Sequence, residues 1–199
     1  MRNSFRAFFQ ANWPGLLVAV LALAVYLVTL SPFMTWEDSG ELATAAATLG
    51  IPHPTGYPLF AMLGRIFSVL PLGDLRVIVK LNVMAALICT AAVYFYYRLF
   101  LLLLVDRTAF PSRKVASPLS VKGRKAGAVP SPKADSATGP RHARLAAALG
   151  AFSLAFSWTF WSEAVSLEVY ALHLLMLSIV SLVFLRSLAR PESQRLWIL

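Results

Sequence analysis

Residues 81–105 read LNVMAALICTAAVYFYYRLFLLLLV, an apolar run of 25 residues that decides the class of this protein. A helix of about 20 apolar residues crosses the hydrocarbon core of a bilayer, which is roughly 30 Å thick. Only Asn82 near the start and Arg98 near the end interrupt the run, and the long Arg98 side chain can reach the interface. The sequence therefore predicts a membrane-spanning helix and an integral membrane protein.

Two further apolar stretches flank this run. Residues 13–30 are apolar for 18 residues, just enough for one span, and no small-residue cleavage site of a signal peptide follows them. Residues 145–185 are apolar over 41 residues with a polar interruption in the middle, so two spans at about 145–161 and 168–186 fit best. The last four residues, 196–199, could begin a fifth span, and we expect the chain to be part of a longer protein.

The basic residues predict an orientation. The net charge is +9, but the lysines and arginines gather at the ends of apolar runs, which is typical of a topology signal rather than of nucleic-acid binding. Residues 106–144 are rich in proline and hold nine basic residues against two acidic ones, which indicates a flexible loop. The positive-inside rule places the N-terminus, this loop and residues 186–195 in the cytoplasm.

This orientation puts the segment 31–80 and the polar turn near 161–168 on the outer face. We therefore predict an all-α polytopic membrane protein with about four spans, and short helices in the first external segment. The alanine-rich composition favours a bacterial inner membrane over the endoplasmic reticulum. The single cysteine, Cys89, excludes an internal disulfide framework or a thiolate metal site within this chain.

The external segment opens with an acidic motif, Trp36-Glu-Asp-Ser-Gly-Glu41. A helix over 38–49 would place Asp38 and Glu41 three residues apart on one face. One hypothesis is that these two carboxylates cap the helix, in an arrangement like a capping box. The other is that a carboxylate at the lipid boundary acts as a general base on a substrate hydroxyl.

The next stretch, 51–58, contains three prolines and predicts a rigid turn. This turn could hold His53 and Tyr57 near the acids, although a structural histidine and an interfacial aromatic are the simpler interpretations. Residues 59–70 are apolar but too few to span. Within them, Arg65 could either reach lipid phosphates or hold the phosphate of a lipid-linked substrate.

The later acidic residues are weaker candidates. Glu168 lies at the head of a predicted span, on the same side as the first acidic motif. Glu163 is expected to lie in a solvated turn, and His173 is expected to pack between helices. The carboxylates at 37, 38 and 41 could bind a divalent metal, but the ligand set is too sparse to assign one.

Several of these motifs resemble a known family. Asp38-Ser-Gly-Glu-Leu42, then His53-Pro-Thr-Gly-Tyr-Pro-Leu59 followed by Leu63-Gly64, are similar to the signature of the transmembrane protein O-mannosyltransferase-like family. That family belongs to the GT-C superfamily of polytopic glycosyltransferases. The match extends in order over about 25 residues, and Thr55 departs from the usual second proline. The stretches 158–161 and 168–170 are similar too, but less diagnostic.

The resemblance implies a membrane glycosyltransferase that takes a mannose-like sugar from a polyprenyl-phosphate carrier and gives it to a protein or lipid hydroxyl on the outer or lumenal face. No other cofactor and no nucleic acid is implied. The alternative is a non-catalytic membrane component, such as a transporter fragment or an assembly partner, in which the acidic motif only caps a helix. By the resemblance, Asp38 would be the catalytic base with Glu41 beside it, and the substrate-binding candidates are Glu37, His53, Tyr57, Arg65 and Glu168.

Overall fold

The computed structural model describes residues 2–35, 38–54, 56–105 and 139–189, and these form seven α-helices. The helices are α1 (Arg2–Val28), α2 (Ser39–Thr48), α3 (Pro58–Val69), α4 (Val77–Val105), α5 (Pro140–Ala155), α6 (Trp158–Val165) and α7 (Tyr170–Ala189). The predicted all-α class is confirmed, and the expected short helices of the first external segment are α2 and α3.

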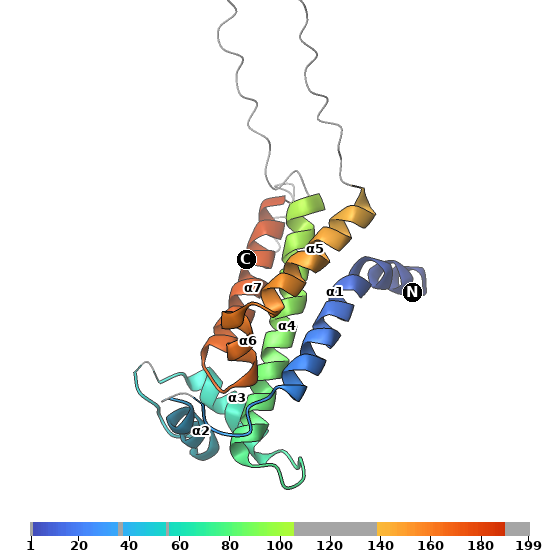
Figure 1. Cartoon of the computed structure of the whole chain (residues 1–199). Coiled ribbons are helices and arrows are strands. Elements are labelled where there is room, and N and C mark those ends of the chain that lie inside the picture. Colours follow the sequence, from blue (N-terminus) through green and yellow to red (C-terminus); the bar gives the residue numbers. More distant parts are fainter. Residues whose placement is uncertain (1, 36–37, 55, 106–138, 190–199) are drawn as a thin grey trace, which may run out of the picture.

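α4 is the central helix of the bundle. It contacts α1, α5, α6 and α7 along its length and α2 and α3 near its first turns (Figure 1). By length and composition α4 and α7 can each cross a membrane, and α5 with α6 could form a third, broken span. The straight apolar part of α1, Asn12–Val28, is shorter. The described residues thus contain two to three candidate spans and show an integral membrane protein.

The predicted span at 145–161 is not one continuous helix in the structure. α5 and α6 meet at an angle of 65°, and α6 includes residues 161–165 of the predicted polar turn. α5 also begins within the predicted loop 106–144. The Tyr26 hydroxyl donates a hydrogen bond of 2.7 Å to the Ala155 carbonyl at the break. This bond satisfies a terminal helix carbonyl inside the bundle, so the helix can end there.

Small side chains allow the helices to approach closely. Ala143, Ala147, Ala151 and Ala155 are fully buried and lie four residues apart along one face of α5. Further buried alanines of α4 join them in the same core. Membrane helices pack through small residues of this kind because lipid offers no hydrophobic driving force between helices.

α1 bends near its proline. Figure 1 shows the N-terminal part of α1 turned away from the rest of the helix. Pro14 lies inside α1 and has no N–H, so it cannot bond the carbonyl of Gln10, four residues earlier. Arg144 of α5 donates a hydrogen bond of 2.7 Å to that same carbonyl. A neighbouring helix therefore satisfies the group that the proline leaves free.

A second, smaller core joins α2 and α3 to the bundle. α2 and α3 lie together at the end of the molecule where α4 begins (Figure 1). A Cβ on Gly64 would lie 2.6 Å from the Ala46 Cβ, so only glycine allows this contact between α2 and α3. Leu167 and Val169, from the connection between α6 and α7, are buried in the same core. This packing fixes α2, α3 and residue 168 relative to one another.

Candidate functional site

The site begins where α2 begins. Asp38 occupies the N-cap position of α2, but its exposed side chain makes no capping hydrogen bond. Glu41, in the first turn, directs both carboxylate oxygens to His53. Neither carboxylate therefore makes the hydrogen bonds of a capping box, and Asp38 presents its carboxylate to the exterior of the protein.

Glu41 and His53 form a two-point contact. The His53 backbone N–H donates to Glu41 Oε1 at 2.6 Å, and the His53 Nδ1 lies 3.1 Å from Oε2. An ionised carboxylate only accepts, so Nδ1 carries the hydrogen in this arrangement. The hydrogen bonds from the His53 ring and then from its backbone lower the pKa of Glu41. Glu41 is thus held as a carboxylate and clamps the turn that follows α2.

The turn between α2 and α3 contains two left-handed residues, and its predicted rigidity stays a prediction. The Gly56 N–H donates to the His53 carbonyl at 3.0 Å, and Gly56 has a φ of +83° that favours glycine. Tyr57 is also left-handed, with φ +38°, and caps α3 at its N-terminus just before Pro58. The Tyr57 ring meets the His53 ring edge to face, with centroids 5.6 Å apart. The phenol and the imidazole therefore lie side by side next to Glu41.

Glu168 reaches the site from the far end of the sequence. It lies between α6 and α7, where its neighbours Leu167 and Val169 are buried against α2, α3 and α4. Partial burial raises the pKa of Glu168, the negative charge of Asp38 raises it further, and His53 opposes the shift. Glu168 is thus within electrostatic reach of Asp38 and His53, and the weaker candidate from the sequence joins the stronger ones.

Backbone and side-chain hydrogen bonds position the segment that leads from α1 to Asp38. The Ser31 N–H donates to the Val165 carbonyl at 3.0 Å, and Asn82 Nδ2 donates to the Ser31 carbonyl at 2.8 Å. The Trp161 indole N–H donates to Thr29 Oγ1 at 3.1 Å. These bonds tie the segment to α4 and α6, and so bring Asp38 and Glu168 to one side of the molecule.

Asn82 is the positioning residue that the sequence analysis missed. It is fully buried, and a buried amide at the start of an apolar run was the available signal, because polar groups inside a membrane bundle usually have a specific partner. The sequence pattern alone identified it only as an interruption of the span.

Three candidates lie elsewhere than expected or outside the described residues. The Arg65 guanidinium donates to the Ala47 carbonyl near the C-terminal end of α2, about 14 Å of helix away from Asp38. Glu163 is half-buried in α6, and its Oε2 is buried with no partner among the described residues, so the predicted solvated turn is wrong. Glu37 lies outside the described residues.

The cluster offers ligands for a cation, and apolar hollows flank it. One ligand atom each from Asp38, Glu41 and His53 lie within 4.8 Å of one another, and carboxylate oxygens with one imidazole suit several divalent metals. A groove of about 470 Å³ lies near the segment before Asp38, and a recess of about 300 Å³ adjoins Tyr57 and Val169. The groove is lined by Thr35, Trp158, Trp161, Ser162, Val165 and Ser166.

The segment that carries the site has relatives among known proteins. Residues 38–199 match the family described as Protein O-mannosyl-transferase TMEM260 N-terminal domain. The chain is 38% identical over 82 residues to Protein O-mannosyl-transferase tmem260 of Dictyostelium discoideum, which covers 41% of this chain and 10% of the relative. It is 40% identical over 87 residues to Protein O-mannosyl-transferase TMEM260 of Mus musculus, which covers 42% of this chain and 12% of the relative.

The chain spans about a tenth of the length of these curated relatives. No solved structure matches it. The family match covers most of the chain and starts at Asp38, the residue at which the acidic site begins. The predicted resemblance is therefore confirmed, and this chain belongs to the family of the Protein O-mannosyl-transferase TMEM260 N-terminal domain.

Proposed function

We propose that this protein is part of a membrane glycosyltransferase of the GT-C type, with Asp38 as the catalytic base. The observation that carries the proposal is the exposed Asp38 carboxylate, which has no capping hydrogen bond and lies beside the Glu41–His53 pair. A carboxylate that merely capped α2 would bond the free N–H groups of the first turn. The family membership supports transfer of a mannose-like sugar to a hydroxyl.

The proposed donor is a sugar linked to a polyprenyl phosphate. Its apolar carrier would remain in the bilayer while the sugar reaches the external site. The recess at Tyr57 adjoins the site, and the groove at Trp158 and Trp161 lies near the segment before Asp38. Both are mainly apolar, which suits a lipid carrier. The acceptor would be a hydroxyl of a protein or a lipid.

In the proposed reaction, Asp38 accepts the proton of the acceptor hydroxyl as its oxygen attacks the anomeric carbon. The bond between the anomeric carbon and the phosphate oxygen breaks, the lipid phosphate leaves with the bonding electrons, and the anomeric configuration inverts. Glu41 holds the turn and so positions His53 and Tyr57 around the reacting groups. Glu168 adds a carboxylate from the connection between α6 and α7. Glu37 remains a candidate for substrate binding.

The proposed topology has four crossings, made by α1, α4, the broken pair α5–α6, and α7. The N-terminus and residues 106–144 would be cytoplasmic, as the basic residues predict. The site would then face the outer or lumenal side, where lipid-linked donors are used by enzymes of this type. A bacterial inner membrane rather than the endoplasmic reticulum stays a prediction from composition.

The test is sugar transfer from a polyprenyl-phosphate donor by membranes that contain the protein as its native gene encodes it. We compare wild type, Asp38→Asn and Asp74→Asn at equal expression. Asn retains most of the N-cap ability of Asp but cannot act as a base. Asp74 is exposed in the connection between α3 and α4, so its substitution controls for loss of an external acid.

We expect transfer to fall by at least about 100-fold in Asp38→Asn, the scale of general base catalysis, and to be unchanged in Asp74→Asn. Equal transfer by Asp38→Asn and wild type would refute the proposed base. Normal folding of Asp38→Asn is checked by its thermal unfolding in detergent. No transfer by wild type from any polyprenyl-phosphate sugar would favour the non-catalytic membrane component instead.

A further inference from the structure

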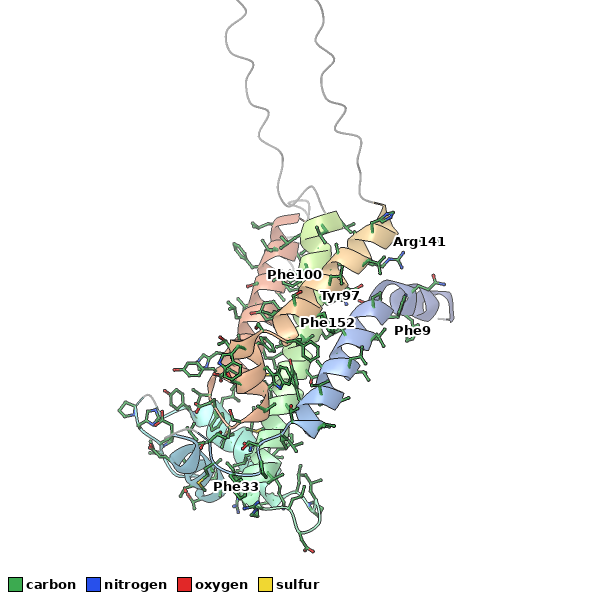
Figure 2. The ribbon with its side chains drawn as sticks, in the orientation of Figure 1. Phe9, Phe33, Tyr97, Phe100, Arg141 and Phe152 are labelled. Atoms are coloured by element: carbon green, nitrogen blue, oxygen red, sulfur yellow. The ribbon has the colours of Figure 1, made fainter. Side chains whose placement is uncertain are left out.

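A recess with two arginines in its lining lies towards the end of the bundle opposite the acidic site. Its volume is about 240 Å³, and it is lined by Trp13, Pro14, Arg141, Arg144 and Leu145. Figure 2 shows Arg141 at the N-terminal end of α5 and Phe33 at the other end of the molecule, near α2. The recess is therefore remote from Asp38, and the proposed transfer reaction does not use it.

The bend of α1 and the start of α5 build this recess together. Pro14 turns the N-terminal part of α1 away from the bundle, and Arg144 bonds the Gln10 carbonyl that the proline leaves free. That bond fixes the Arg144 side chain at the bend. Arg141 is exposed, three residues earlier on α5, so two guanidinium groups adjoin one hollow.

The recess continues into an apolar face. Leu145, Leu149 and Phe152 of α5 are 57%, 68% and 45% exposed and share one side of the helix. Trp13, 46% exposed, lies at the other rim, and tryptophan is typical of the membrane interface. Along α5 the two cations therefore come first, and the apolar side chains follow towards the centre of the bundle, from Arg141 to Phe152 (Figure 2).

This order matches the chemistry of one kind of ligand. A phosphate accepts paired hydrogen bonds from guanidinium groups, and a fatty acyl chain needs an exposed apolar path of the kind that α5 offers. A nucleotide or an acidic peptide would use the cations but would leave the leucine face uncovered. The excess of arginine at this end of the bundle also favours a ligand with net negative charge.

We propose that the recess binds one anionic glycerophospholipid, with its phosphate between Arg141 and Arg144 and an acyl chain along Leu145 and Leu149. The bound lipid fills the angle between the bent part of α1 and α5. It thereby stabilises the bend of α1 in the membrane surface. This inference depends only on the membrane character of the chain, not on the transferase activity.

The test measures lipid retained by the purified full-length protein. The protein is delipidated in detergent, incubated with mixed micelles that contain either phosphatidylglycerol or phosphatidylcholine, and examined by native mass spectrometry. We expect one phosphatidylglycerol to be retained and no phosphatidylcholine. In Arg141→Gln, retention of phosphatidylglycerol should fall roughly tenfold, as for loss of one charge-assisted hydrogen bond. Arg141 is chosen because Arg144→Gln would also disturb the bend of α1.

The matched control is Arg76→Gln, which removes an exposed arginine at the opposite end of the molecule, over the Phe33 ring. Retention should be unchanged in this variant. An equal loss in both variants would show general charge attraction and overturn the proposal. Equal retention of phosphatidylglycerol and phosphatidylcholine by wild type would also overturn it, as would retention of phosphatidylglycerol by Arg141→Gln at the wild-type level.

Discussion

Glu41 and His53 show how far single residues could be predicted. The spacing of Asp38 and Glu41 predicted a shared helix face, and the prolines after α2 predicted a turn that brings His53 near the acids. The direct Glu41–His53 contact could not be predicted, because it depends on how the chain turns at the left-handed Leu49, which ends α2. Arg65 was singled out as a cation inside an apolar segment. Its bond to the Ala47 carbonyl could not be predicted, because it depends on how α3 packs on α2.

The Glu41–His53 contact should weaken in acid. The pKa of Glu41 lies below its ordinary value of 4.5 in the folded protein, so the contact stabilises the fold above about pH 4.5 and loses this effect as the pH falls through the folded pKa. We expect the hydrogen-exchange protection factor of the 50–57 turn to fall as the pH is lowered from 4.5 through the folded pKa of Glu41. Exchange with mass spectrometry measures it.

Glu41→Gln provides the comparison for this measurement. Gln can still accept from the His53 backbone N–H but has no charge to lose, so protection of the turn should be lower at pH 7 and should not change in acid. A turn in the variant that still loses protection below pH 4.5 would assign the acid effect to another group.

Arg65 should matter for α2 rather than for transfer. Its guanidinium bonds the Ala47 carbonyl near the end of α2, far from Asp38. We expect Arg65→Gln to lower the thermal unfolding midpoint slightly and to change the rate of sugar transfer by no more than about twofold. Loss of transfer with an unchanged unfolding midpoint would instead support the predicted role of Arg65 in holding the donor phosphate.

At the scale of helices, apolar length was informative and helix breaks were not. The run at 81–105 predicted α4 to within one turn at its start, because a span must be long, apolar and helical. At the break between α5 and α6, the Tyr26 hydroxyl bonds the Ala155 carbonyl, a contact between residues 129 positions apart. Such a contact leaves no local signature in the sequence, so the position of the break was missed.

Asn82 should control the segment that precedes the site. It is fully buried in α4 and donates to the Ser31 carbonyl. The leucine of Asn82→Leu cannot donate, so the Ser31 carbonyl should lose its hydrogen-bond partner. This should lower the free energy of unfolding by about 1–3 kcal/mol and raise amide exchange in residues 29–35. Thr90→Val on the same helix is the control, because Thr90 Oγ1 has no partner among the described residues. Equal exchange in the two variants would contradict the positioning role.

Gly15 should be essential for the contact of α1 with α4. A Cβ at this position would lie 2.1 Å from Cδ1 of the fully buried Tyr97 ring, and such a ring has no room to move. Gly15→Ala is therefore expected to lower the free energy of unfolding in detergent by about 1–3 kcal/mol. Gly139→Ala, whose Cβ would have an ordinary contact at 3.5 Å, should cost much less. An equal loss of unfolding free energy in Gly139→Ala and Gly15→Ala would show that the loss of glycine flexibility, and not the contact with Tyr97, causes the effect.

For the whole molecule, composition predicted a membrane bundle with chemically different ends, and the arrangement of α4 agrees with that prediction. The acidic site lies where α4 begins, and the arginine recess lies between α1 and α5, towards the other end of the molecule. The side of the membrane that each end faces depends on insertion, which packing within the chain does not determine. The basic residues predict it.

Cysteine labelling can measure the topology, because the native Cys89 is fully buried and can be replaced by alanine. In this background we introduce Asp74→Cys or His142→Cys, both at exposed positions. Since α4 separates the two positions and is long enough to cross a bilayer, they should lie on opposite sides. A membrane-impermeant maleimide should label position 74 on the intact outer or lumenal face and position 142 only after permeabilisation. Labelling of both from one side would show that α4 does not cross, and exchanged sides would place the Asp38 site in the cytoplasm.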